Sequence, residues 1–307
     1  MMNDYKKIFD ILVSNTKAYV VKNNIEAMIL GISGGIDSTV CAAICHEVSK
    51  QTGIPLIGRS LPTKYNKEEE TYASDLVGKA FCNDYMSVNI HNLYQRVGLY
   101  ITTAESGMLN NPKYPQTKIA DGNIQARLRM IYLYNLASTH KGIVIDTDNL
   151  TEHNLGYWTI HGDVGDFNPI GGLWKTEVFE LAKWLMDYYK DPHVRGYNEQ
   201  ATAVIMSLNL KPTAGLGITN SDLEEIGAES YEQVDGILQE ILAWKANNAD
   251  HGVYYESLEM EQLAFLDEQQ MLCYPTKVII AVTERHFKSE FKRKGLPVVI
   301  FRSLFTS

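Results

Sequence analysis

The sequence lacks an uninterrupted apolar run of the roughly 20 residues that a membrane-spanning helix requires. It also lacks an excess of basic residues: 28 Lys and Arg stand against 37 Asp and Glu, and the net charge is −9. Nucleic-acid backbones are bound by clustered cations, so we expect neither a membrane nor a nucleic acid as partner. The N-terminal residues mix charges into a helical pattern and do not resemble a signal peptide, which predicts a cytoplasmic protein.

Cysteine is scarce, and no cysteine pair has the spacing of a metal or redox motif. Cys41, Cys45, Cys82 and Cys273 lie in apolar sequence surroundings without CxxC spacing. This pattern indicates reduced packing residues rather than disulfides or zinc ligands. The phosphate-binding pattern GxxxxGK[ST] and the dinucleotide pattern GxGxxG are also absent. Neither of these two common nucleotide sites is therefore expected.

Short apolar runs alternate with helical patterns in the first half of the chain. The strand-like runs are residues 27–32, 55–61, 85–90 and 142–148, and the helix-like patterns are residues 5–19, 40–48, 67–81 and 123–140. This alternation predicts βαβ units, and therefore an α/β fold with an open parallel sheet flanked by helices. Later residues are mostly helical in pattern. We expect one domain, residues 1–307, with a sheet-containing part to about residue 190 and a largely helical C-terminal part at about 191–307.

The stretch SGGIDS, residues 33–38, follows the first predicted strand and opens a helix. Backbone NH groups and the positive end of a helix dipole meet at such a turn and suit an anion. No lysine follows, and Asp37 would repel a phosphate unless a cation lay between them, which is a usual role of Mg²⁺. On this loop alone, an ordinary turn with Asp37 and Ser38 capping the helix is an almost equal alternative.

The SGGIDS loop resembles the SGGxDS motif of the PP-loop ATP pyrophosphatases, which cleave ATP between its α and β phosphates. Residues 146–177 are similar to the NAD synthetase pattern GTDxxxExxxGxxTxxGDGGxDxxPLxxLxK. GNIQARLRM at 122–130, KPTAGL at 211–216 and SEFKRKGLP at 289–297 resemble further motifs of that family, in the same order. The resemblance covers nearly the whole chain, apart from an apparent insertion between about residues 243 and 275. It identifies the chain as similar to the ammonia-dependent NAD synthetases.

The resemblance implies a Rossmann-like fold of the adenine nucleotide alpha hydrolase type and a set of site residues. ATP would be bound by Gly31, Ser33, Gly34, Gly35, Asp37, Ser38, Thr147, Lys175 and Thr213. Deamido-NAD⁺ would be contacted by Arg127, Asp166 and Lys292. Mg²⁺ would be held by Asp37 and Glu152, and the catalytic residues would be Lys175 and Asp163, the latter beside the attacking ammonia.

The chemistry of the residues agrees with part of this assignment. In an open parallel sheet the loops after the strands converge, so Asp37 and Glu152 would meet and share Mg²⁺. Lys175 opens an amphipathic helix, where a cation opposes the helix dipole unless an anion lies nearby. Taken alone, Glu152 is better explained as a solvated first-turn carboxylate and Asp163 equally well as a turn residue. Arg127 and Arg129 occupy a helix whose other face carries Ile124, Leu128, Ile131 and Leu133.

The implied reaction is ATP-dependent amidation of deamido-NAD⁺ to NAD⁺ with ammonia, through an acyl-adenylate and with release of AMP and pyrophosphate. The length leaves no room for a glutamine-hydrolysing domain, so we expect free ammonia as donor, and the resemblance implies a homodimer. Three departures from the pattern are Ile160 where the family often has lysine, the shortened segment GDVGD, and Phe291 in place of histidine. The alternatives are an altered substrate preference, another PP-loop enzyme (a GMP synthetase-like amidating subunit or a tRNA-modifying enzyme) and an inactive nucleotide-binding relative.

Overall fold

The computed structural model describes residues 4–104, 118–191, 193, 198–211, 221–251, 253, 257–268, 273–293 and 298–299. In this part of the chain, six strands form one sheet in the order β3-β2-β1-β4-β5-β6, and every neighbouring pair is parallel. The strands are β1 (Met28–Gly31), β2 (Leu56–Ser60), β3 (Asp84–Ser87), β4 (Ile143–Ile145), β5 (Phe167–Asn168) and β6 (Val298–Val299). The predicted open parallel sheet is confirmed, and the two-residue strands β5 and β6 are additions to it.

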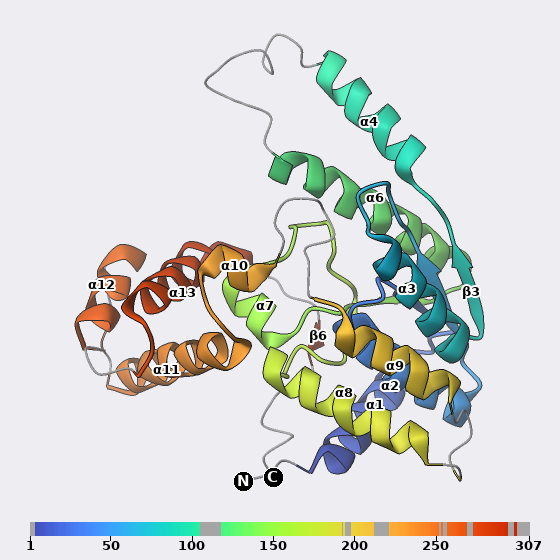
Figure 1. Cartoon of the computed structure of the whole chain (residues 1–307), viewed down its shortest axis with the longest axis horizontal. Helices are drawn as coiled ribbons and strands as arrows, with labels where there is room; N and C mark the ends of the chain where they lie inside the picture. Colours follow the sequence, from blue (N-terminus) through green and yellow to red (C-terminus); the bar gives the residue numbers. More distant parts are fainter. Residues whose placement is uncertain are drawn as a thin grey trace.

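Helices surround the sheet and make up most of the later part of the chain (Figure 1). They are α1 (Tyr5–Lys22), α2 (Ile36–Thr52), α3 (Glu68–Phe81), α4 (His91–Ala104), α6 (Lys118–Thr139), α7 (Leu150–Leu155), α8 (Lys175–Lys190), α9 (Glu199–Asn209), α10 (Asp222–Ile226), α11 (Tyr231–Asp250), α12 (Leu258–Glu268), α13 (Thr276–Lys288) and the short 3₁₀ turn η1 (Glu290–Arg293). The sequence pattern predicted helices at α1, α2, α3, α6 and α8, but it gave no element for α4.

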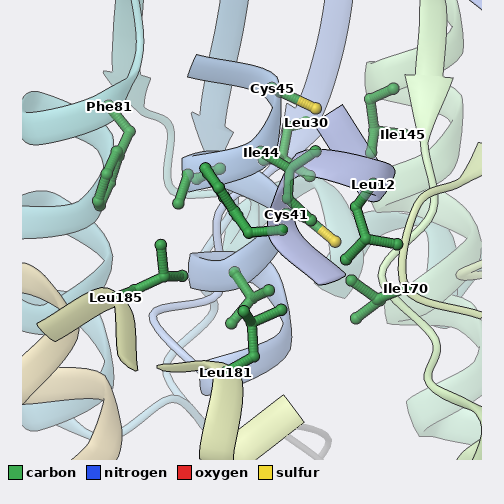
Figure 2. Close-up of a cluster of buried hydrophobic side chains, with 14 of the residues drawn as sticks. Leu12, Leu30, Cys41, Ile44, Cys45, Phe81, Ile145, Ile170, Leu181 and Leu185 are labelled. Atoms are coloured by element: carbon green, nitrogen blue, oxygen red, sulfur yellow. The ribbon is translucent and has the colours of Figure 1, made fainter. Parts of the chain in front are cut away.

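Alternate strand residues serve two apolar clusters on opposite faces of the sheet, as the period of two in a strand requires. Met28 and Leu30 pack with α1, α2, α8 and α9, whereas Ile29 and Val144 pack with α6. Figure 2 shows the first cluster, in which Leu12, Ile44 and Leu181 come from three different helices. The sheet is therefore buried on both sides, which is typical of parallel sheets.

A third apolar cluster lies within α7 and α10 to α13 and includes Leu155, Ile237 and Val282. These helices gather on one side of the molecule in Figure 1.

Two expectations about single side chains are wrong. Cys273 is exposed, unlike the buried Cys41 and Cys45, so it is not a packing residue of the core. Ile131 is 65% exposed and does not share the buried face of Leu128 and Leu133, because it projects from the side of α6 away from the sheet.

The strand order reverses between β1 and β4, because the chain runs outward from β1 to β2 and β3 before it returns to β4. Ligands of open α/β sheets bind in the crevice at the carboxyl ends of the strands at such a switch point. SGGIDS follows β1, and the segment beginning at Asp146 follows β4. The topology thus brings the two predicted motifs together. In the described part of the chain, no helix is long and apolar enough to cross a membrane.

Candidate active site

A cavity of about 730 Å³ opens at the switch point. Most of the predicted site residues line it: Gly31, Ser33, Gly35, Asp37, Ser38, Thr147, Glu152, Asp163, Lys175 and Lys292. Gly34, Arg127 and Asp166 are not among its lining residues. Thr213 and most of its KPTAGL loop lie outside the described residues. The segments named by the sequence therefore converge on one cavity, although they are spread over much of the chain.

The SGGIDS loop is fixed by its own hydroxyl groups and by close contact with α3. The hydroxyls of Ser33 and Ser38 are 2.9 Å apart, and the backbone NH of Gly35 donates to the Ser33 hydroxyl at 3.2 Å. Gly34 has φ +84°, and a Cβ added there would lie 2.6 Å from the backbone oxygen of Glu70. Only glycine fits this position, which leads the chain into the N-terminus of α2.

Lys175 places its ammonium group between the two predicted metal ligands. Its Nζ atom lies 2.5 Å from Oδ2 of Asp37 and 3.1 Å from Oε1 of Glu152. The lysine side chain is only 3% exposed. Burial lowers the pKa of Lys175, but the two carboxylates outweigh this effect and hold the pKa well above its usual range. A cation at the N-terminus of a helix is unfavourable because it opposes the helix dipole. The two carboxylates compensate this buried cation at the start of α8.

Asn149 ties the loop after β4 to the loop after β1. It caps α7 by accepting from the backbone NH of Thr151 and Glu152, and its Nδ2 donates to Oδ1 of Asp37 at 2.9 Å. The carboxylate of Glu152 in turn accepts from the backbone NH of Asn149 at 3.2 Å. Burial raises the pKa of Glu152 to about 8, while Lys175 pulls it down. Asp37 and Glu152 are therefore held by different partners but converge on one point.

That point suits a hard divalent cation. Carboxylate oxygens are the protein ligands Mg²⁺ prefers, and Mg²⁺ is usually bound by one or two carboxylates together with substrate phosphates. Among the described residues, no group of three or more His, Cys, Asp or Glu could hold a metal ion. The donor set therefore fits a metal that arrives with a phosphate ligand, rather than a metal held by the protein alone.

Three carboxylates, those of Asp146, Asp148 and Asp163, lie close together on one side of the cavity. Asp146 is 2% exposed and accepts from the backbone NH groups of Asp148 and Gly165 at 2.8 and 3.0 Å. Burial raises the pKa of Asp146 to about 7 and, together with the charge of Asp146, raises the pKa of Asp148 well above its usual range. Burial also raises the pKa of Asp163, which accepts from the backbone NH of Thr159 at 2.5 Å. This side of the cavity is suited to binding a cation or holding a proton.

Lys292 approaches the cavity from η1. Its ammonium group donates to the carbonyl oxygens of Gly156 and Trp158, both at 2.6 Å, and so fixes the chain that follows α7. Burial lowers the pKa of Lys292, whereas Asp163 raises it. The lysine therefore lies on the same side of the cavity as Asp163 and its neighbouring carboxylates.

Two residues of the predicted dinucleotide group point elsewhere in this structure. Arg127 is exposed and donates to the carbonyl oxygen of Ile160 at 3.2 Å. Asp166 accepts from the backbone NH of Val144 at 2.9 Å and from the hydroxyl of Tyr134 at 3.1 Å. Neither Arg127 nor Asp166 is among the residues that line the cavity.

Sequence reasoning missed three arginines that line the cavity, namely Arg59, Arg129 and Arg285. Arg129 donates to the carbonyl oxygen of Leu61 and to Oδ1 of Asn66, at 3.1 and 3.3 Å. Arg285, on α13, lies 3.6 Å from the centre of the Tyr157 ring and pairs with Glu225. The helical period of residues 123–140 did not show that Arg129 lines the cavity, and nothing in the sequence singled out Arg59 or Arg285.

The comparisons with known proteins decide the family. A family model described as NAD synthase matches residues 8–295. The chain belongs to the NAD synthase family. Curated relatives named NH(3)-dependent NAD(+) synthetase include that of Methanosarcina acetivorans, 29% identical over 96% of this chain and 98% of its own length. That of Thermoplasma volcanium is 32% identical over 69% of this chain and 76% of its own length.

Solved structures of the family have the same fold. The NMN synthetase from Francisella tularensis matches with a TM-score of 0.67 and 26% identity, covering 95% of this chain and 96% of that one. The NH3-dependent NAD synthetase from Campylobacter jejuni matches with a TM-score of 0.64 and 23% identity, covering 97% and 99%. The resemblance to ammonia-dependent NAD synthetases, and with it the expectation of a ligase that forms a C–N bond, is confirmed by this membership.

Proposed function

We propose that this chain converts deamido-NAD⁺ to NAD⁺ with ATP and ammonia. The nicotinate carboxylate attacks the α-phosphate of ATP and displaces pyrophosphate, and ammonia then displaces AMP from the acyl-adenylate. The proposal rests mainly on the position of the Lys175 ammonium group. It lies between Asp37 and Glu152 in the cavity, beside the SGGIDS loop. Membership of the NAD synthase family supports the choice of reaction.

In the adenylation step, the chain's own groups position the triphosphate and neutralise its charge. Backbone NH groups of Gly34 and Gly35 and the hydroxyls of Ser33 and Ser38 would bind phosphate oxygens at the start of α2. Asp37 and Glu152 would hold Mg²⁺, which supplies charge neutralisation at the phosphates when it is bound. Lys175 would then pair with phosphate oxygens, and Gly31, Thr147 and Thr213 would contact the nucleotide. Preorganised cations of this kind stabilise the charge that grows on the leaving pyrophosphate.

In the amidation step, Asp163 would receive ammonium. A carboxylate whose pKa is raised by burial can bind the cation and take up its proton, which leaves neutral ammonia to attack the acyl carbon. Lys292, Arg127 and Asp166 would contact the pyridine dinucleotide. For Arg127 and Asp166, this role requires that the side chains leave their present partners, the Ile160 carbonyl and Tyr134.

The same carboxylate chemistry would also serve a mononucleotide. Deamido-NMN carries the nicotinate carboxylate that deamido-NAD⁺ carries, and a structural relative at 26% identity is an NMN synthetase. Ile160 stands where the resemblance leads us to expect a lysine, which removes one positive charge from the dinucleotide side. We therefore keep deamido-NMN as a second candidate substrate.

The deciding experiment supplies ATP, Mg²⁺ and ammonium with one acceptor at a time: deamido-NAD⁺, deamido-NMN, xanthosine monophosphate or tRNA. We expect AMP and NAD⁺ to form with the first acceptor at the highest kcat/KM. A higher value with deamido-NMN would transfer the assignment to the mononucleotide. AMP formation with xanthosine monophosphate or tRNA alone would refute both.

A homodimer is also proposed, with α4 and α6 at its interface. Both helices expose large apolar side chains, namely Leu93, Leu99, Tyr100 and Ile101 on α4 and Ile119, Ile131 and Tyr134 on α6. Clustered exposed apolar groups are typical of protein interfaces, and most oligomers join identical copies. In sedimentation experiments we expect Ile131→Glu to yield monomers, whereas Met260→Glu, at a similarly exposed position on α12, leaves dimers intact.

A further inference from the structure

Asp235 is a buried carboxylate that lies outside the cavity lining. It is carried by α11, within the helical part of the chain, and is 2% exposed. Its Oδ1 accepts from the hydroxyl of Thr151 at 2.5 Å, and its Oδ2 accepts from the backbone NH of Thr176 at 3.0 Å. Burial raises the pKa of Asp235, and these two donors oppose the rise. A carboxylate buried this deeply is costly, so its hydrogen bonds call for an explanation.

The hydrogen bonds of Asp235 lead directly to the cation of the site. The Thr151 hydroxyl, which donates to Asp235, accepts from the backbone NH of Lys175 at 2.8 Å. Thr151 precedes Glu152 in α7, and Thr176 follows Lys175 in α8. Asp235 is therefore linked to the neighbours of both Lys175 and Glu152, which together form the ion pair at the loop.

The anchored backbone is the first turn of α8, where NH groups have no partner within the helix. Asp235 and Thr151 satisfy two of these groups, those of Thr176 and Lys175. The negative charge also favours the N-terminus of the helix, which the ammonium group of Lys175 opposes. The backbone NH of Trp174, the N-cap residue, donates to Glu177 of the same helix at 3.0 Å, whereas the NH groups of Lys175 and Thr176 are anchored from α7 and α11.

We propose that Asp235 is a positioning residue for the adenylation step. Through the Thr151 hydroxyl and the Thr176 NH it holds the start of α8 against α7, so that Lys175 and Glu152 keep their alignment toward Asp37. The inference rests on the proposed function and names a residue that acts through Lys175. Displacement of a catalytic group by about 1 Å is enough to slow a reaction by about 100-fold.

Substitutions at Asp235 and Thr151 test this role. In Asp235→Asn, the amide supplies one acceptor for two donors, so the amide NH₂ faces either the Thr176 NH or the Thr151 hydroxyl. Thr151→Val keeps the side-chain shape but removes the hydroxyl, whereas Thr151→Ser keeps the hydroxyl. We expect Thr151→Val and Asp235→Asn to lower the kcat of pyrophosphate release by about 10- to 100-fold. Thr151→Ser should keep most of the rate.

A double variant separates positioning from folding. If Thr151 and Asp235 act through Lys175, the double variant Thr151→Val/Lys175→Met will be no slower than Lys175→Met alone. Lys245→Met is the control for stability, because it breaks the contacts of α11 with Glu261 and Glu290 and touches neither α7 nor α8. It should lower the unfolding midpoint while leaving the kcat of folded protein unchanged.

Two results would overturn the inference: unchanged kcat per folded molecule in Thr151→Val and Asp235→Asn, or losses that multiply in the double variant. Failure of the proposed function is recognised separately, because the wild-type chain would then release no pyrophosphate with any acceptor. In that case the same variants are compared for ATP affinity in the presence of Mg²⁺ by calorimetry. Weaker binding in Thr151→Val, absent on the Lys175→Met background, supports the positioning role. Equal affinity of Thr151→Val and wild type counts against it.

Discussion

The ammonium group of Lys175 lies 2.5 Å from Oδ2 of Asp37, although 138 residues separate the two in the chain. The loop after β1 and the start of α8 are therefore joined at one charged atom. Glu152 approaches the same atom from α7, the helix that follows β4. A cation of the protein occupies the point where two carboxylates converge, and a metal ion bound there would compete with it.

Replacement of Lys175 tests this competition. In Lys175→Met, the two carboxylates lose their shared cation and repel each other, so we expect pyrophosphate release to fall by at least about 100-fold. Added Mg²⁺ should raise the unfolding midpoint of this variant more than that of the wild type. Lys183→Met is the control, since Lys183 is an exposed lysine of the same helix and pairs with Glu180 at the surface. Equal responses to Mg²⁺ in wild type and Lys175→Met would contradict the shared site.

Asp37 and Asp163 should fail at different steps. We expect Asp37→Ala to abolish pyrophosphate release, because the triphosphate loses a metal ligand. Asp163→Ala should release pyrophosphate at a rate near that of the wild type, but form the amide about 100-fold more slowly and with a raised KM for ammonium. The two products are measured in parallel under single-turnover conditions. Equal loss of pyrophosphate release in both variants would refute the division of roles.

Gly34→Ala should destabilise the fold through two effects at one residue. The backbone has φ +84°, and the new Cβ would meet the backbone of Glu70 and Ser74 at 2.6 and 2.7 Å. Gly53→Ala is a matched control, since φ is +77° there but no atom lies within 4 Å of the added Cβ. We expect denaturant unfolding to show a loss of about 1 kcal/mol for Gly53→Ala and at least about 3 kcal/mol for Gly34→Ala. Similar losses of unfolding free energy in the two variants would show that α3 moves to make room for the added methyl group at residue 34.

His286 should make stability depend on pH on the acidic side. Burial, together with the charges of Arg293 and Lys245, lowers the pKa of His286 to about 3. The unfolded chain binds a proton near pH 6.5, whereas the folded chain does not. The stabilisation is therefore complete above pH 6.5 and is lost as pH falls, by about 3 kcal/mol at pH 4.

The variant His286→Gln isolates this effect. Other groups titrate in the same range, since the pKa of Asp146 is raised to about 7 and that of His153 is lowered to about 4. The quantity to compare is therefore the difference in unfolding free energy between wild type and variant at each pH. We expect the wild type to lose its advantage over His286→Gln between pH 6.5 and 4. A difference that does not change with pH would count against a neutral, buried His286.

Much of the sheet and of the phosphate side of the cavity could be predicted from local patterns. Apolar runs followed by glycine or aspartate mark buried strands with loops at their carboxyl ends, and parallel pairing brings those loops together. This is why Asp37 and Glu152 were expected to lie side by side. In the structure, both carboxylates pair with the ammonium group of Lys175. Their role as metal ligands stays a prediction.

Other features had no local signal. The strands β5 and β6 are two residues each, too short to show a strand period. Helix α4 exposes Leu93, Leu99 and Ile101, so its apolar residues do not mark a face toward the core. In α6 the period did not show that Arg129 lines the cavity while Arg127 contacts Ile160 from outside. Asp235 depends on α11 packing against α7 and α8, which no single segment encodes.

The cavity is lined both by residues of the two apolar clusters on the sheet, such as Ile145 and Val144, and by Arg285 on α13 of the helical cluster. A ligand that touches the sheet clusters and the helical cluster adds its binding free energy to the contacts between them. We expect the free chain to lose these clusters in separate steps on heating, and the ligand-bound chain to lose them together. Bound substrate would thus couple the unfolding of the clusters, and a single, narrower thermal unfolding transition would indicate that the site is occupied.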